Sequence, residues 1–147
     1  MISDRLPLAL DAVTLPGDGP IAVLHPPEGA DLSALPQERI VVVSPMATVC
    51  AGFAERGFTV SAELPTETRF CTSILCLTRA RAEAQALVAA AMARTDGLVI
   101  VDGQKTDGAD SMLKAMRARV KVSAPISKAH GKIYWAEGGD GFADWVK

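Results

Sequence analysis

Long apolar runs are absent from this chain of 147 residues, and cysteine is scarce. No uninterrupted apolar run approaches the roughly 20 residues that a transmembrane helix needs, and no basic segment followed by an apolar one opens the sequence as a signal peptide. We therefore expect a soluble protein of the cytoplasm. The three cysteines, Cys50, Cys71 and Cys76, are an odd and sparse set that argues against a disulfide framework, so we expect them to be reduced and buried.

The composition indicates one globular domain. Charged residues make up 22% of the chain and hydrophobic residues 49%, which is too little charge for a disordered tail and enough apolar surface for one core. A length of 147 residues excludes two full independent domains.

The net charge of −2 hides an uneven distribution of charged residues. Residues 103–135 hold seven basic and two acidic side chains, whereas the rest of the chain holds eight basic and fifteen acidic ones. A concentrated basic region favours contact with a polyanion. The charged residues of this region are Lys105, Lys114, Arg117, Arg119, Lys121, Lys128 and Lys132, with Asp107 and Asp110.

Short β-prone runs alternate with segments of helical periodicity along most of the chain. Such an alternation indicates a mostly parallel sheet with right-handed crossovers and helices on both faces. The pattern predicts strands at residues 21–25, 40–43, 58–60, 73–77 and 98–101, and helices at residues 4–13, after the N-cap Ser44, after Thr78, and after a cap at Asp107 or Asp110.

Two β-prone runs without a helix between them end the pattern, at residues 120–125 and 131–136, with residues 126–130 as the loop of a hairpin. This ending is the one expected of the class I methyltransferase sheet, whose last strand runs antiparallel between its neighbours. We therefore predict an α/β fold: a Rossmann-like, class I methyltransferase-type three-layer sandwich with a mostly parallel sheet that ends in an antiparallel hairpin.

The loops that follow the predicted strands lack the residues of a cofactor site. A nucleotide or S-adenosylmethionine fold needs several glycines after its first strand, but residues 25–31 contain one glycine and two prolines. Gly17 and Gly19 precede that strand and so lie at the wrong end of the sheet. Residues 77–81, after the fourth strand, lack the Asn-Pro-Pro-aromatic type of sequence that holds a target amine. We therefore predict no cofactor-binding and no catalytic residue in this chain.

The histidines and cysteines do not indicate a metal site. His25 and His130 lie far apart in the sequence. Cys71 and Cys76 differ by five positions, which on one strand points them to opposite faces. Core packing explains the cysteines, and a surface or turn position explains the histidines.

Two basic loops are the candidate binding sites. Residues 102–108 place Lys105 before a helix N-terminus, where it would hold a phosphate; a tight turn capped by an aspartate is the alternative. Residues 127–132 bring two lysines and a histidine around a glycine, and an ordinary basic turn is the alternative. Arg117 and Arg119 either extend this surface or form a solvated helix face. The candidate RNA-contact residues are Lys105, Arg117, Arg119, Lys128, His130 and Lys132.

Both loops also carry a resemblance to a known family. Residues 101–108, Val-Asp-Gly-Gln-Lys-Thr-Asp-Gly, and residues 127–132, Ser-Lys-Ala-His-Gly-Lys, resemble the N-terminal domain of bacterial 16S rRNA guanine-N2 methyltransferases of the small-methyltransferase family. The similarity extends over nearly the whole chain. It implies that a C-terminal domain binds S-adenosylmethionine and carries an Asn-Pro-Pro-Phe motif, whereas the N-terminal domain has lost both. No family catalytic residue can be carried over, because no position here matches the catalytic motifs.

The resemblance further implies that the chain is part of a longer protein. Residues 1–141 would be a degenerate methyltransferase-like domain, and residues 142–147 would start the linker to a C-terminal catalytic domain. Phe142 and Trp145 would then belong to an interdomain surface; a docked C-terminal tail is the alternative.

These observations lead to one functional hypothesis and two alternatives. The hypothesis is a cofactor-free domain that supports the catalytic domain and helps to present ribosomal RNA to it through phosphate contacts, in an enzyme that methylates a guanine exocyclic amine. Its partners would be its own catalytic domain and ribosomal RNA or the small ribosomal subunit. The alternatives are a complete, divergent S-adenosylmethionine-dependent methyltransferase and a purely structural domain that shields its partner.

Overall fold

One mixed sheet forms the centre of this computed structural model, which describes residues 2–65, 67–78, 80–139 and 141–145. Its strands are β1 (Ile21–Leu24), β2 (Ile40–Val43), β3 (Thr59–Ser61), β4 (Phe70–Cys76), β5 (Thr95–Gln104), β6 (Ile126–Lys128) and β7 (Gly131–Glu137). Within the described residues, these seven strands pair in the order β3-β2-β1-β4-β5-β7-β6. The first five are parallel, and β7 runs antiparallel between β5 and β6. The predicted mostly parallel sheet with an antiparallel hairpin is confirmed.

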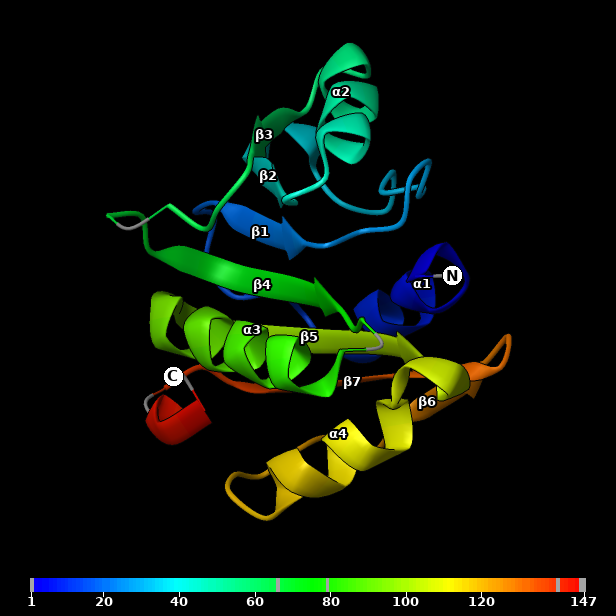
Figure 1. Ribbon diagram of the computed structural model, residues 1–147, viewed down its shortest axis with the longest axis vertical. Helices are drawn as coiled ribbons and strands as arrows, with labels where there is room; N and C mark the ends of the chain where they lie inside the picture. The colour runs from blue at the N-terminus through cyan, green and yellow to red at the C-terminus, as the bar shows by residue number, and fades with distance from the viewer. Residues whose placement is uncertain (1, 66, 79, 140, 146–147) are drawn as a thin grey trace.

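Helices cover both faces of the sheet (Figure 1). Helices α1 (Ile2–Ala12) and α2 (Ala47–Glu55) pack on one face, and α3 (Arg81–Arg94) and α4 (Ala109–Arg117) pack on the other. Short 3-10 turns are η1 (Gln37–Arg39), η2 (Lys105–Asp107) and η3 (Ala143–Trp145). None of the helices within the described residues is long and apolar enough to cross a membrane.

The apolar strand runs explain why the sheet lies between two helical layers. Successive side chains of a strand point to opposite faces, so a strand with helices on both sides is apolar at every position. In β1, Ile21 and Val23 belong to the core under α1 and α2, whereas Ala22 and Leu24 belong to the core under α3 and α4. All four are 0% exposed, which matches a strand in the middle of the sheet.

The carboxyl ends of the parallel strands all lie along one side of the sheet, which we call the carboxyl edge. There η2 follows β5 directly. Because β7 runs antiparallel to β5, its first residue, Gly131, pairs with Gln104 at the end of β5. The turn of the β6–β7 hairpin therefore returns to the carboxyl edge, and Figure 1 shows it beside η2 and close to α1.

The hairpin differs from the prediction at its first strand. Residues 120–125 do not form a strand, and three of the residues predicted as the loop form β6 instead. The N–H of Val120 still donates to the carbonyl of Met116, which prolongs the end of α4, and Pro125 has no N–H to offer a sheet. The turn itself consists of Ala129 and His130, with φ angles of 51° and 61°. Positive φ at both central residues is typical of a type I′ hairpin turn.

Two helix starts also differ from the prediction. Gly108, with a φ of 85°, occupies the N-cap position of α4, which was predicted for Asp107 or Asp110. A glycine takes this left-handed conformation without the steric cost that an aspartate would meet. Helix α2 begins two residues later than predicted, because the Oγ of Ser44 accepts from the N–H of Met46 in a turn before the helix.

The cysteines are all free, as expected, but only one of them is buried. Cys76 lies in the core, whereas Cys50 and Cys71 are half-buried. The Sγ of Cys50 lies 3.3 Å from the carbonyl oxygen of Ser44, and the N–H of Gly19 donates to the Sγ of Cys71 at 3.2 Å. Both thiols thus pack against polar backbone near the ends of their elements.

Two glycines give opposite predictions for stability. A Cβ at Gly97, near the start of β5, would clash with the carbonyl oxygen of Cys71 and with Pro16, whereas a Cβ at Gly52, within α2, would meet nothing within 4 Å. We expect Gly97→Ala to lower the free energy of unfolding by about 2 kcal/mol or more through overpacking. Gly52→Ala should raise it by about 0.5–1 kcal/mol, because alanine favours the helix. Urea unfolding measures both, and a Gly97→Ala protein as stable as wild type would contradict this packing.

Candidate functional site

A buried ion pair lies under the carboxyl edge. Asp102, near the end of β5, accepts from the Nε of Arg5 at 2.5 Å and from its second guanidinium nitrogen at 2.9 Å. The Arg5 side chain is 0% exposed and that of Asp102 is 4% exposed. Burial raises the pKa of the Asp102 carboxyl, against the opposing effect of the two hydrogen bonds from Arg5. The pair joins α1 to the end of the fifth strand.

The same guanidinium holds the hairpin turn. Arg5 donates to the carbonyl of Lys128 at 2.9 Å and to the side-chain oxygen of Gln104 at 2.7 Å. A Cβ at Gly131 would clash with this guanidinium and with the backbone carbonyl oxygen of Gly103, so glycine is required where the hairpin passes Arg5. The N–H of Lys105 completes the connection by donating to the carbonyl of His130 at 2.8 Å. Backbone and side chain together fix the hairpin turn against η2.

Sequence reasoning did not identify Arg5. The sequence did indicate that Arg5 is buried, because Arg5 lies among Ile2, Leu6 and Ala9 on the apolar face of α1. A charged side chain on a buried helical face needs a partner. The partner is ninety-seven positions away, which no local pattern indicates.

The structure brings four of the six predicted RNA-contact residues together. Lys105 comes from η2, and Lys128, His130 and Lys132 come from the hairpin; they line one pocket of about 360 Å³, which we call the basic pocket. Ala109, Asp110, Ser127 and Gly131 complete its wall. The Nζ of Lys132 lies 2.6 Å from a carboxylate oxygen of Asp110, and that hydrogen bond lowers the pKa of Asp110.

The start of α4 beside this pocket is held by a tyrosine. The hydroxyl of Tyr134 donates to the carbonyl of Ala109 at 3.0 Å, and the Tyr134 side chain is fully buried. Burial raises the pKa of Tyr134, so it stays a neutral hydrogen-bond donor. The position of the helix start is thereby coupled to β7, which carries Lys132.

The two predicted arginines lie outside the basic pocket. Arg119 donates to both carboxylate oxygens of Asp144, at 2.5 and 2.7 Å, and its guanidinium lies 4.9 Å from the ring centre of Trp145. Arg117 is exposed in the last turn of α4 and does not line the pocket. Arg119 therefore holds the C-terminal segment to the end of α4.

The aromatic residues of the C-terminal segment pack on this chain. Phe142 is 1% exposed and belongs to the core under α3 and α4, and its ring centre lies 4.7 Å from that of Trp145. Trp145 is half-buried. This position of Phe142 agrees with the alternative of a docked C-terminal tail. Part of the Trp145 side chain remains accessible to solvent.

The carboxyl ends of β1 and β2 do not fit S-adenosylmethionine. Between β1 and β2 the chain forms only the 3-10 turn η1, so no α-helix N-terminus follows β1 to face a ligand. Pro26 is buried there, and His25 has a φ of 55°. Ser44 follows β2, where nucleotide folds place a carboxylate for ribose hydroxyls, and its Oγ is used by its own turn.

His25 lies beside Glu83 and does not line the basic pocket that contains His130. Its Nδ1 lies 3.7 Å from a carboxylate oxygen of Glu83, and burial lowers the pKa of His25. In the part of the chain that the structure describes, no group of three or more histidine, cysteine, aspartate or glutamate residues could hold a metal ion.

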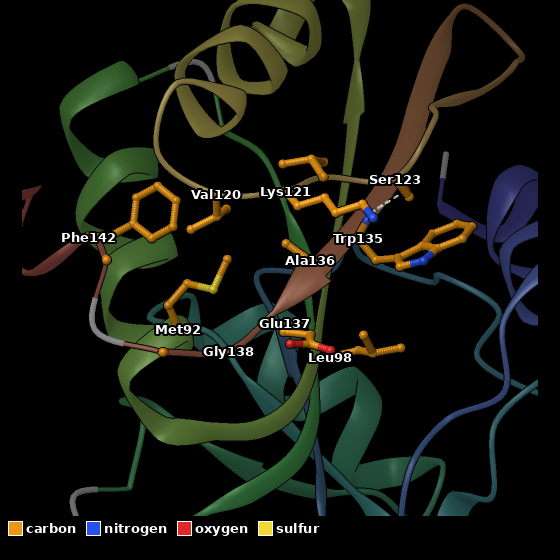
Figure 2. Close-up of a pocket in the computed structure, with 13 residues that line it drawn as sticks. Met92, Leu98, Val120, Lys121, Ser123, Trp135, Ala136, Glu137, Gly138 and Phe142 are labelled. Carbon is orange, nitrogen blue, oxygen red and sulfur yellow. Dashed lines mark hydrogen bonds between the residues drawn. The ribbon is translucent and has the colours of Figure 1, made fainter.

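The described part of the chain also lines cavities outside the basic pocket, two of which are large enough to consider. One, of about 560 Å³, lies near the start of β5 and the end of β7, at the edge opposite the carboxyl edge; Figure 2 shows Phe142 and Trp135 on its two sides. The other, of about 190 Å³, lies at the carboxyl edge between the starts of α3 and α4, and we call it the polar pocket. It is lined by Thr78, Ala84, Gln85, Thr106, Asp107, Gly108, Ser111, Met112 and Ala115. Parallel sheets place their ligands at the carboxyl edge, which favours the basic and polar pockets as the functional site.

Known structures share this fold. No protein-family model and no curated protein sequence matches the chain. The chain is similar to the 16S rRNA N2 G1207 methyltransferase (RsmC) of T. thermophilus in complex with AdoMet and guanosine, with a TM-score of 0.70 and 19% identity over 93% of this chain. It spans 38% of the length of that structure.

Two further structures have the same architecture. Thermoplasma acidophilum 1320 matches with a TM-score of 0.66 and 14% identity, over 92% of this chain and 84% of that one. The ribosomal protein L11 methylase of Lactobacillus delbrueckii subsp. bulgaricus matches with a TM-score of 0.61 and 7% identity, over 93% of this chain and 79% of that one. The chain therefore has a methyltransferase-like fold.

The buried pair gives a prediction for stability. Arg5→Met should lower the free energy of unfolding by about 3–5 kcal/mol, because it leaves the Asp102 carboxylate buried without its partner. Adding Asp102→Leu should recover much of that loss. Arg69→Met is the matched control: Arg69 pairs with Asp96 at 2.7 Å on the surface, and its loss should cost about 1 kcal/mol or less. Urea unfolding that finds equal costs for Arg5→Met and Arg69→Met would contradict the role assigned to Arg5.

Proposed function

We propose that this chain is the RNA-binding, cofactor-free domain of a larger S-adenosylmethionine-dependent 16S rRNA guanine-N2 methyltransferase of the cytoplasm. The observation that carries the proposal is the basic pocket, in which Lys105, Lys128, His130 and Lys132 meet at the carboxyl edge. Two findings support a role within a longer enzyme. The fold is methyltransferase-like, and the chain spans only 38% of the length of the RsmC structure.

The chemistry of the basic pocket suits phosphates of an RNA backbone. Three lysines and a histidine line the pocket together with one carboxylate, that of Asp110. This carboxylate already accepts a hydrogen bond from the Nζ of Lys132. Lysine contacts of this kind release counterions and give salt-dependent affinity and orientation, without reading the sequence of bases. Arg5 would act indirectly, because its hydrogen bonds hold the hairpin that carries Lys128.

Transfer of the methyl group would belong to a C-terminal catalytic domain, for which S-adenosylmethionine supplies the methyl group when bound. In this proposal residues 1–141 form the supporting domain and residues 142–147 start the linker, whose first residue, Phe142, packs into the core of the domain. Residues 146 and 147 lie outside the described part of the chain. Trp145, half-buried beside Phe142, is the side chain we propose contacts the catalytic domain.

The alternative of a complete, divergent methyltransferase requires a cofactor site in this chain. The helix-free connection after β1 and the serine after β2 argue against one. Calorimetric titration of the chain with S-adenosylmethionine should therefore give no saturable heat at micromolar concentrations. A one-to-one isotherm with a micromolar dissociation constant would favour the enzyme and overturn the cofactor-free proposal.

Removing the lysines of the basic pocket tests RNA binding. The triple variant Lys105→Ala, Lys128→Ala, Lys132→Ala should bind a 16S rRNA fragment about tenfold or more weakly near 0.1 M salt, because three phosphate contacts are lost. The slope of log affinity against log salt concentration should become shallower by about 2. Filter binding over a series of salt concentrations measures both quantities.

A matched control separates the pocket from general charge. Lys114 and Lys121 are exposed lysines of the same basic region that do not line the basic pocket. The double variant Lys114→Ala, Lys121→Ala should keep most of the affinity of the wild type. An equal loss in this double variant would argue against a defined site. Unchanged binding in the triple variant would favour the purely structural, partner-shielding role.

A further inference from the structure

A carboxylate of the chain itself lies among the cations of the basic pocket. Asp110, in the first turn of α4, lines this pocket together with Lys105 and Lys132. One oxygen of its carboxylate lies 2.6 Å from the Nζ of Lys132. The hydrogen bond from Lys132, together with the charges of Lys132 and Lys105, lowers the pKa of Asp110, so the carboxylate is ionised at neutral pH. It therefore takes a position that also suits the oxygen of a bound anion.

The start of α4 does not depend on this ion pair. Successive side chains of β7 point to opposite faces of the sheet, so Lys132 and Tyr134 both point to the face that α4 covers. The hydroxyl of Tyr134 donates to the carbonyl of Ala109 in the core. The side chains of Lys132 and Asp110, in contrast, are 34% and 53% exposed. The buried contact fixes the helix backbone, and the accessible ion pair beside it can open without moving the helix.

An accessible ion pair is weak enough for a ligand to replace. Exposed pairs of lysine and carboxylate favour the paired state by about fivefold at most, because water and salt compete for both charges. A phosphate of an RNA strand offers Lys132 another anion, while neighbouring phosphates of the same strand contact Lys105 and Lys128. The strand can therefore displace the carboxylate at a small loss of affinity.

We propose that Asp110 is an internal competitor for the basic pocket: its carboxylate pairs with Lys132 in the free chain, and a phosphate of the RNA backbone displaces it. This inference rests on the proposed RNA binding and adds a residue that limits the affinity of that site. The chain binds RNA less tightly than its lysines alone would allow. A weaker complex dissociates faster, which favours release of the RNA.

A double-mutant cycle tests the competition. Asp110→Asn keeps the shape of the side chain and removes its charge, so this variant should bind the 16S rRNA fragment about two- to fivefold more tightly than wild type near 0.1 M salt. The slope of log affinity against log salt concentration should become steeper by up to about 1, because Lys132 is no longer neutralised in the free chain. In the background of Lys132→Ala, the gain from Asp110→Asn should largely disappear. Filter binding over a series of salt concentrations measures these quantities.

Asp96→Asn is the matched control. Asp96 is also an exposed aspartate in an ion pair, because its carboxylate lies 2.7 Å from a guanidinium nitrogen of Arg69. It lies near the start of β5, at the edge opposite the carboxyl edge. This substitution changes the net charge by the same amount as Asp110→Asn, so its affinity for RNA should stay close to that of wild type. Urea unfolding confirms that each variant folds.

The outcomes separate this inference from the proposed function. If neither wild type nor Asp110→Asn binds the RNA fragment, the proposed RNA binding is wrong, and this inference falls with it. If wild type binds and Asp110→Asn binds no more tightly, only the inference is overturned. The inference is also overturned by a gain of full size in the Lys132→Ala background, or by an equal gain in Asp96→Asn, since either would indicate a general effect of charge.

Discussion

The guanidinium of Arg5 is the contact on which the arrangement of the carboxyl edge depends. It links three segments that are distant in sequence: the first helix, the end of β5 at Asp102, and the hairpin turn at Lys128. Each link is a hydrogen bond to a charged or carbonyl oxygen away from solvent, where an unpaired group would be costly. Gly131 lets the hairpin pass close to this guanidinium. The basic pocket is built on the elements that this one side chain holds together.

The fold depends on the order of the strands, whereas the candidate site depends on the residues that follow them. The strand order β3-β2-β1-β4-β5-β7-β6 belongs to a methyltransferase-like fold. The connections after β1 and β2, however, carry prolines and a serine in place of glycines and a carboxylate. The polar and charged groups lie instead after β4 and β5 and in the hairpin. The candidate site thus differs from the cofactor site expected of this fold, in keeping with the general rule that a common fold can carry different sites.

Local patterns predicted the elements well and their ends less well. The buried strands were predicted from apolar runs such as residues 40–43, because a strand covered on both faces must be apolar throughout. The strand predicted at residues 120–125 was wrong, because the end of α4 and Pro125 decide that segment. The sequence placed Lys105 on one loop and Lys128, His130 and Lys132 on another, but it did not predict that the two loops line one pocket. The pairing of Arg119 with Asp144, which was also not predicted, joins residues twenty-five positions apart.

The sequence by itself determined the order of strands and helices, the antiparallel ending and the location of the basic residues on two loops. These follow from periodicity, turn residues and composition, which act over a few neighbouring positions. Only the tertiary structure decided which cations face one pocket and that a buried arginine holds that pocket's walls. These features depend on distances between side chains on separate elements, which are set when the two layers of helices pack against the sheet.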